Sequence, residues 1–279
     1  MKKFIWFLSI LSFSVCVSAQ IEDCAYAKFY KDSTYLTLGE NVNIRLNPDT
    51  TGKKLYQAQI GERVRIIEDT QIPYTRNGYT ANWYRVVYND KGYKTEGYIW
   101  GGFLSTQAIP STSNKGLVYL YGITKIVKQE YFDEVYINVR VVEDNKQLAK
   151  VELRAVGGLR TYNTGESLGN KGLEGVSDIL KINFSDGYCA GAFGDVYLFW
   201  DGTTLHHVKT LDEGFDAPYS ATNRFVFPTD EKGKKGLIIN KSESGFYGDD
   251  DKFHIENWER VTYKWDGSKL VVVKTEKKK

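Results

Sequence analysis

Cysteine, methionine and proline are scarce in this 279-residue sequence, which contains three, one and five of them. Three Cys and three scattered His do not form a zinc-binding signature. An excess of one charge is also missing, because the chain without residues 1–19 carries 35 basic and 35 acidic residues. Nucleic-acid binding is therefore not expected, since phosphate contacts need dense Lys and Arg.

Long apolar runs are absent except near the N-terminus, where two lysines precede an uncharged apolar segment at residues 4–17. The segment ends in the small-residue sequence VSA, so we predict a signal peptide at residues 1–19 that is cleaved after Ala19. It falls short of the roughly 20 residues that a membrane anchor needs. Lipidation at Cys16 is an alternative, but the preceding residues lack the usual Leu and small residue. We expect a secreted or periplasmic protein with no transmembrane segment after cleavage.

Two cysteines lie beyond the predicted cleavage site, Cys24 and Cys189. In an oxidising compartment two such thiols can pair, and this disulfide would connect the start of the mature chain to its distal part. Two buried free thiols are the alternative, because sequence spacing does not establish proximity.

Aromatic residues and glycine are abundant, with 20 Tyr, 6 Trp and 26 Gly, whereas long helical periodicity is missing. Short alternating segments recur between Asn-Gly, Asp-Gly and Gly-Gly pairs that are typical of hairpin turns. We therefore predict an all-β fold. The pattern is interrupted at residues 105–116 by small polar residues and Pro110. We expect a linker at 107–116 between a small barrel at 34–106 and a β-rich domain at 117–275.

The distal domain is predicted to hold about eight to ten short strands, as in an antiparallel sandwich. Residues 197–210 and 261–275 share Trp-Asp-Gly followed by Leu and Val-Lys-Thr. Each stretch is predicted as a hairpin with a type I′ turn on Asp-Gly. A propeller would repeat such hairpins, but the intervening segment has no third copy. This domain also resembles uncharacterised β domains of secreted Bacteroidetes proteins, which implies no activity.

The first part of the chain carries short motifs in a fixed order: NIR at 43–45 followed by Pro48, GERVRI at 61–66, WYRV at 83–86, and GYI at 97–99 followed by FL at 103–104. This order resembles the bacterial SH3 (SH3b) domain over about residues 34–106. The resemblance implies a small barrel that binds peptidoglycan peptides or other envelope ligands. The loop at 69–81 is longer than in many members, and a different ligand preference would follow from that.

We expect a peptide groove on this barrel, lined by aromatic rings and by amide and carboxylate groups. Flat rings bury a sparsely decorated backbone at low entropy cost, which suits short Gly- and Ala-rich peptides. The alternative for Trp83 and Tyr98 is that they fill the barrel core, because a small barrel needs large apolar side chains. The candidate ligand-binding residues are Asn47, Asp49, Tyr56, Tyr79, Trp83, Tyr98 and Trp100.

The sequence reveals no catalytic centre, no cofactor motif and no metal site. Cys189 with His206 or His207 is the nearest arrangement to a peptidase pair, but Cys189 lacks the helix start that activates such a thiolate. His206 and His207 are neighbours on a predicted strand and so point to opposite faces. The acidic stretch at 247–257 lacks the ligand spacing of an EF-hand loop.

Three hypotheses follow. The motifs favour an exported, non-enzymatic protein whose barrel binds peptidoglycan peptide or an envelope protein. The second hypothesis is a cell-wall hydrolase with its catalytic site in the C-terminal domain. The third is a structural adaptor whose barrel has no ligand.

Overall fold

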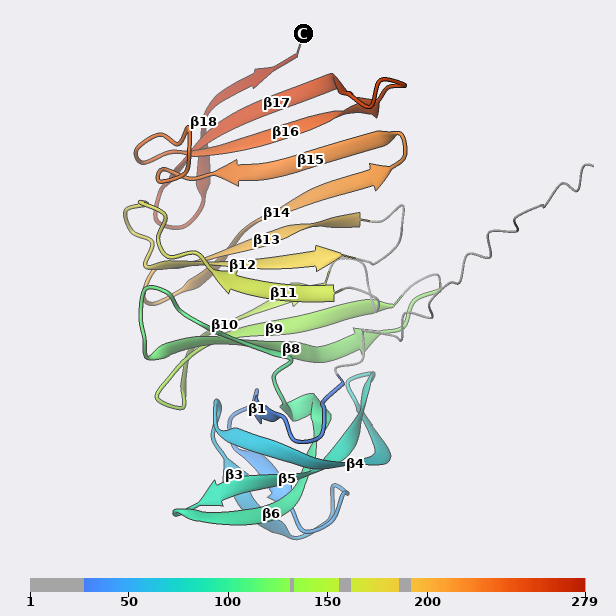
Figure 1. Ribbon diagram of the computed structural model, residues 1–279. Coiled ribbons are helices and arrows are strands. Elements are labelled where there is room, and N and C mark those ends of the chain that lie inside the picture. The colour runs from blue at the N-terminus through green and yellow to red at the C-terminus, as the bar shows by residue number, and fades with distance from the viewer. Residues whose placement is uncertain (1–27, 131–132, 156–161, 186–191, 279) are drawn as a thin grey trace, which may run out of the picture.

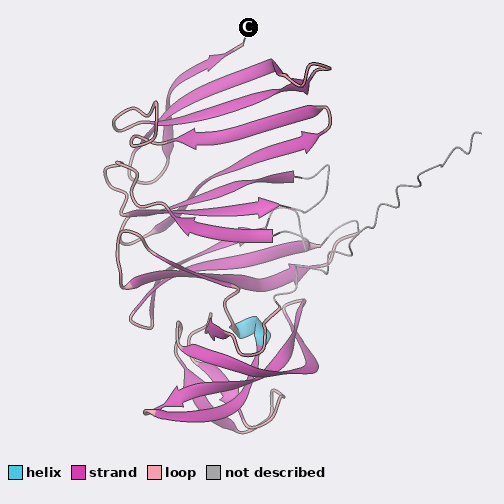
Figure 2. Cartoon of the chain, in the orientation of Figure 1, coloured by secondary structure: helices cyan, strands magenta, loops and turns pink. Residues whose placement is uncertain are grey.

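The computed structural model describes residues 28–130, 133–155, 162–185 and 192–278, and strands dominate all four ranges (Figures 1 and 2). Among these residues the helical structure is a 3₁₀ turn, η1 (Gly101–Phe103), so the prediction of an all-β fold is confirmed. Within the same ranges, no helix has the length and apolar character needed to cross a bilayer. The predicted signal peptide, Cys16, and the proposed pair of Cys24 and Cys189 lie outside the described residues.

The first six strands form one curled sheet in the order β1-β4-β5-β6-β2-β3. Alternation directs every second side chain inward, and Ile44, Val86 and Ile99 are among the residues that fill the resulting core. The sheet therefore has the small-barrel form that the sequence motifs predict. Its strands are β1 (Thr34–Leu36), β2 (Val42–Arg45), β3 (Lys54–Ala58), β4 (Arg63–Arg76), β5 (Tyr79–Asp90) and β6 (Tyr93–Trp100).

A second, four-stranded antiparallel sheet follows in the order β10-β9-β8-β7. The first of these strands along the chain, β7, lies inside the predicted linker at 107–116. There Ile109 pairs with Tyr119 of β8, and its side chain is part of the core. Pro110 is tolerated there because β7 is an edge strand. Residues 107–110 are thus part of a sheet, and only residues 111–116 of the predicted linker lie outside the strands. The strands are β7 (Gln107–Pro110), β8 (Leu117–Val127), β9 (Glu134–Glu143) and β10 (Lys146–Arg154).

The third sheet is an eight-stranded meander in which neighbours in sequence are neighbours in space, from β11 to β18. A meander of this kind has no separate blades, so the propeller alternative is excluded for the described residues. Its strands are β11 (Tyr162–Ser167), β12 (Asp178–Ser185), β13 (Ala192–Trp200), β14 (Leu205–Asp216), β15 (Tyr219–Val226), β16 (Ile238–Tyr247), β17 (Phe253–Trp265) and β18 (Leu270–Lys277).

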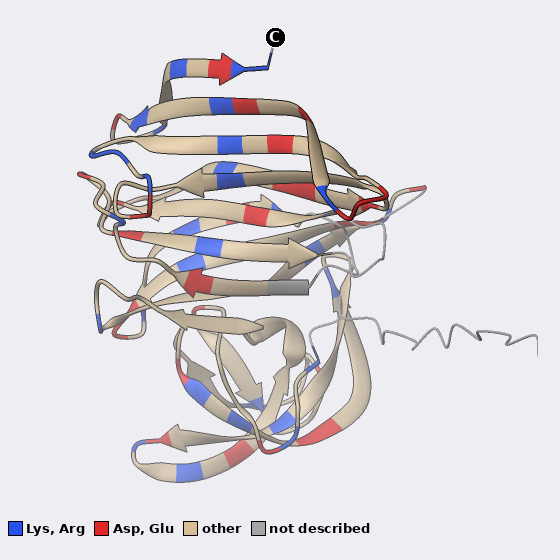
Figure 3. Cartoon of the chain, turned by 45° about the horizontal axis from the view of Figure 1, so that its top comes forward, with Lys and Arg blue, Asp and Glu red and all other residues tan. Residues whose placement is uncertain are grey.

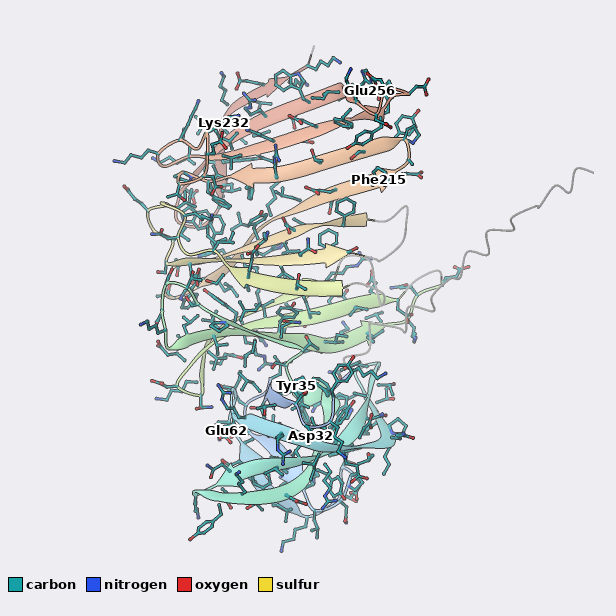
Figure 4. The ribbon with its side chains drawn as sticks, viewed as in Figure 1. Asp32, Tyr35, Glu62, Phe215, Lys232 and Glu256 are labelled. Atoms are coloured by element: carbon teal, nitrogen blue, oxygen red, sulfur yellow. The ribbon has the colours of Figure 1, made fainter. Side chains whose placement is uncertain are left out.

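The two distal sheets pack face to face and form the predicted sandwich. Their shared core joins Tyr119 and Val139 of the four-stranded sheet to Leu180 and Leu198 of the meander. Strands β12 and β13 are buried on both faces, because Ile179 and Phe199 belong to a second core on the opposite side. The meander continues beyond the four-stranded sheet as far as β18 (Figure 1), and Phe215 is exposed near the end of its middle strand β14 (Figure 4).

The two Trp-Asp-Gly stretches form the predicted hairpins, β13–β14 and β17–β18, but their turns differ from the prediction. Each loop has four residues, 201–204 and 266–269, and the positive φ angle falls on Gly202 or Gly267 and not on the Asp. In both loops the Asp carboxylate accepts hydrogen bonds from the backbone N–H groups two and three residues later. The Asp side chain therefore closes the turn, which a two-residue type I′ turn would not require.

These turn carboxylates make the hairpins sensitive to acid. Hydrogen bonds from the N–H groups of Lys269 and Ser268 hold the pKa of Asp266 below its ordinary value. A depressed pKa contributes stability that is fully present above the unfolded-state pKa of about 3.9 and is lost as pH falls below it. We expect Asp266→Asn to lose less thermal stability than the wild type between about pH 5 and about pH 2. Equal losses in melting scans at the two pH values would contradict this role.

Candidate functional site

The long hairpin of β4 and β5 extends beyond the barrel and contacts strand β8. At its tip the carbonyl oxygen of Asn77 accepts a hydrogen bond of 3.0 Å from the N–H of Ile126. Gly78 follows with a positive φ of 74°, and a Cβ at this position would collide with the carbonyl oxygen of Ile126. The segment at 69–81, which the sequence indicates as a loop longer than in many SH3b domains, thus forms part of the contact between the barrel and the distal sheet.

Two apolar clusters seal the same contact. One joins Leu38 and Ile60 of the barrel to Leu120 and Val142 of the four-stranded sheet. Beside it, Asn145 donates a hydrogen bond of 3.0 Å to the carbonyl oxygen of Ile60. The barrel lies directly against the outer face of β8 and β9 in Figure 1. The four-stranded sheet is therefore covered on both faces, by the meander on one side and by the barrel on the other.

The second cluster holds the largest of the predicted ligand-binding residues. Tyr79, Trp83 and Trp100 are 2%, 3% and 3% exposed, and Ile126 and Val135 of the distal sheet cover them. The indole N–H of Trp100 is directed at the carbonyl oxygens of Tyr74 and Ala81, each at 3.0 Å.

The prediction that Tyr79, Trp83 and Trp100 line an open groove does not agree with this burial. These side chains lie on the outer face of β5 and β6, as a groove would require, but a neighbouring sheet occupies that face. The alternative assignment of Trp83 to the barrel core is also wrong, because the covered cluster is outside the barrel. The strands that cover these rings are distant in sequence, so the local alternation of apolar and polar residues does not reveal them.

The other four predicted residues are at three different places. Tyr98 is half-buried at the margin of the aromatic cluster. Tyr56 is opposite Ile44, stacks on Tyr88 with ring centroids 4.9 Å apart, and donates to Glu62 at 3.0 Å. Burial, and then the hydrogen bond to Glu62, raises the pKa of Tyr56 to about 12. Tyr56 and Tyr98 therefore point to opposite faces of the sheet, and a single groove does not hold both.

Asn47 and Asp49 are in the turn between β2 and β3, where Asp49 has a structural role. Its carboxylate accepts hydrogen bonds from the hydroxyl and backbone N–H of Thr51 and from the N–H of Gly52. These bonds, that of the Thr51 hydroxyl first, lower the pKa of Asp49. Arg45 supports the same turn through a 2.6 Å hydrogen bond from Nη1 to the carbonyl oxygen of Gly52. Asn47 remains exposed beside this ordered turn.

Strand register adds a row of residues that the sequence patterns did not identify. Tyr98 is the cross-strand partner of Arg45 on one side and of Arg85 on the other. Directly opposed partners share a face, so two arginine residues flank one tyrosine on the outside of the barrel. We call this set, Arg45, Tyr98 and Arg85, the Arg-Tyr-Arg row. The sequence signal was only that each residue is at an outward position of its own strand.

The Arg85 end of this row is accessible to a ligand. The side chain of Arg85 is 42% exposed. Its Nε and Nη2 both donate to Glu96 Oε2, at 3.0 and 2.5 Å, and its Nη1 lies 3.6 Å from Glu68 Oε2. Ion pairs this exposed contribute little stability, so their loss to a competing carboxylate costs little. Basic and acidic positions are interspersed along the strands in Figure 3, so the row is a local feature and not part of a wide basic surface.

The distal sheets offer no comparable constellation in the described residues. His206 Nε2 lies 2.8 Å from Asp201 Oδ2, whereas His207 Nε2 lies 3.2 Å from Thr210 Oγ1. In the acidic stretch, His254 and Lys252 both contact Asp250. A search of those residues finds no group of three or more His, Cys, Asp or Glu that could hold a metal ion. Cys189 is outside the described ranges.

Comparison with known proteins identifies the barrel. Residues 40–105 match the family model described as the bacterial SH3 domain. This confirms the predicted SH3b resemblance for that part of the chain, which is 66 of the 279 residues. No curated protein and no solved structure matches the chain.

Proposed function

We propose that this chain is an exported, non-enzymatic binding protein whose SH3b barrel recognises a carboxylate-bearing peptide of the bacterial cell envelope, such as a peptidoglycan peptide. The apolar leader predicted at residues 1–19 supports export, and the bacterial SH3 match supports a cell-wall-binding module. The observation that carries the proposal is the Arg-Tyr-Arg row on the outside of that barrel.

The chemistry of the row fits such a peptide. A guanidinium group binds a carboxylate through paired N–H donors, and an aromatic ring supports a peptide backbone by flat contact. Asn47 lies in the turn that Arg45 braces, where its amide is available as a further donor and acceptor. The predicted ligand set is thereby reduced to Asn47 and Tyr98, joined by Arg45 and Arg85.

A pull-down on purified peptidoglycan tests this assignment. We expect Arg85→Gln and Tyr98→Ala each to reduce the retained fraction of the full chain by about tenfold, because each removes one member of the row. Arg65→Gln is the matched control: it removes the same charge from the same barrel, where Arg65 Nη1 pairs with Asp32 Oδ1 at 3.0 Å. Equal losses for Arg85→Gln and Arg65→Gln would show non-specific charge attraction and contradict the proposal.

A structural adaptor is the second candidate, and one observation favours it. The barrel buries Tyr79, Trp83 and Trp100 against the distal sheet, as a module used only for packing would. The same pull-down separates the two functions, because an adaptor without a ligand is not retained even as the wild type. A muropeptide-release assay with wild type and Cys189→Ala tests the remaining hypothesis of a hydrolase.

A further inference from the structure

A pocket of about 270 Å³ lies between the barrel and the outer face of the four-stranded sheet. Trp100, Phe103 and Arg76 line it from the barrel. The sheet contributes Lys125, Asn138, Arg140 and Glu152. Three basic side chains face one acidic side chain, so the pocket carries a net positive charge. It is separate from the Arg-Tyr-Arg row, none of whose members lines it.

The polar residues of this pocket are unexpected at their position. The interface around them consists of the two apolar clusters that join the barrel to β8 and β9. An interface that serves only for packing is expected to have apolar side chains at these positions, because burial of polar groups is unfavourable unless they are hydrogen-bonded. Asn138 is nevertheless only 5% exposed, and burial lowers the pKa of Arg140.

Asn138 has an acceptor atom without a partner. Its Nδ2 group donates to Thr124 Oγ1 at 2.7 Å and points to Glu152 Oε2 at 3.5 Å. A carboxylate only accepts hydrogen bonds, so Glu152 fixes the amide with its NH₂ group on that side. The oxygen Oδ1 is buried and, among the described residues, has no hydrogen-bond donor.

Arg140, in contrast, has a donor group without an acceptor among the described residues. Its Nη1 donates to Gln147 Oε1 at 3.0 Å, whereas the buried Nε–H has no acceptor among the described residues. Three buried side-chain atoms of the described residues have no hydrogen-bond partner, and two of the three belong to residues of this pocket. Buried polar atoms are almost always hydrogen-bonded, so two exceptions at one place call for a partner.

We propose that this pocket binds the carboxyl terminus of a short peptide. A terminal carboxylate supplies acceptors for Arg140 Nε and for the neighbouring cations Arg76 and Lys125, and the adjacent peptide N–H supplies the donor for Asn138 Oδ1. Trp100 and Phe103 form an apolar wall for a small side chain. The volume limits the bound part to about two small residues.

Access to the unpartnered atoms requires a small movement. Both are closed to solvent in this conformation, so a ligand reaches them when a lining side chain turns aside. Arg76 and Lys125 are two flexible side chains of the pocket, and the cationic group of each lies over an aromatic ring, 5.5 Å from the centroid of Phe103 and 4.7 Å from that of Tyr136. Rotation of such flexible side chains is fast and leaves the backbone in place.

Calorimetric titration of the full chain with N-acetyl-dialanine tests the proposal, with its C-terminal amide and inorganic phosphate as comparison probes. We expect saturable binding of the carboxylate form and a loss of about tenfold or more for the amide, which lacks the charge. A longer peptide with the same free terminus is expected to bind at least as well, which distinguishes a chain end from a free dipeptide as the natural source.

Two variants locate the binding. Arg140→Gln and the less disruptive Lys125→Gln are each expected to weaken binding of the carboxylate probe by about tenfold, while Arg65→Gln, which lies outside both the pocket and the row, leaves it unchanged. Thermal unfolding verifies that Arg140→Gln still folds. If Arg140→Gln does not fold, the affinity of Lys125→Gln for the carboxylate probe is the deciding measurement. The proposal is overturned if no probe binds, if amide or phosphate binds as tightly as the carboxylate, or if Lys125→Gln has no effect. Peptidoglycan retention by the row is scored separately, so either site can fail alone.

Discussion

Replacement of Trp100 by alanine is expected to destabilise the protein by roughly 3–5 kcal/mol, the cost of deleting a large buried aromatic side chain. The ring packs edge-on against Tyr74 and Phe103, with centroids 5.4 and 5.2 Å away, and its N–H is hydrogen-bonded. Gly102 lies so close that a Cβ there would collide with the indole. Alanine would leave a cavity in the contact between barrel and distal sheet.

Denaturant unfolding measures this loss, and Tyr93→Ala is the control. Tyr93 is on the same strand but 77% exposed, so its removal is expected to cost less than about 0.5 kcal/mol. Peptidoglycan retention of folded Trp100→Ala should stay near the wild-type level, because retention is assigned to the Arg-Tyr-Arg row and Trp100 is not a member of it. Unchanged stability combined with lost retention would restore Trp100 to the ligand-binding set and contradict its packing role.

Replacement of Asp178 by alanine is expected to be about as costly, roughly 3–5 kcal/mol, because it leaves several buried donors without an acceptor. Asp178 is 0% exposed. Its carboxylate accepts from Tyr119 at 3.1 Å, from Ser167 at 2.8 Å and from the N–H of Gly169 at 3.0 Å, and Ser111 contributes a further hydroxyl.

These donors come from two strands, β8 and β11, and from the loops that follow β7 and β11, so Asp178 connects the two layers of the sandwich. Burial, and then the nearby carboxylate, raises the pKa of Tyr119 and keeps its hydroxyl as a donor. Thermal unfolding of Asp178→Ala and Asp178→Asn provides the measurement. We expect the asparagine variant to lose less, since its amide oxygen still accepts. A loss below about 1 kcal/mol for alanine would refute the connecting role.

The outcome for the predicted site shows which inferences local patterns support. Alternation puts Tyr98 and Trp100 on the same face of β6, because a strand of period two fixes the side to which each residue points, but it left open whether Trp83 faces a groove or the barrel core. It did not reveal that β8 and β9 cover this side. Asp178 had no signal at all: it begins a strand in the sequence, and its four partner segments meet only in the folded sandwich.

The two Trp-Asp-Gly turns also differ from the prediction, because their loop length does not follow from the local sequence. Asp-Gly correctly marked where two hairpins reverse, but a dipeptide does not specify the length of the loop that closes them. That length follows from where the strands stop pairing, at Trp200 with Leu205 and at Trp265 with Leu270.

The amino-acid order alone determined the strand-rich class, the hairpin positions and the bacterial SH3 character of the barrel, because these depend on residues close together in the chain. Only the tertiary structure decided which aromatic rings are covered, which arginines flank Tyr98, and that Asn138 Oδ1 and Arg140 Nε have no hydrogen-bond partner among the described residues. Exposure and hydrogen-bond satisfaction depend on neighbours many residues away, and local spacing does not encode those neighbours.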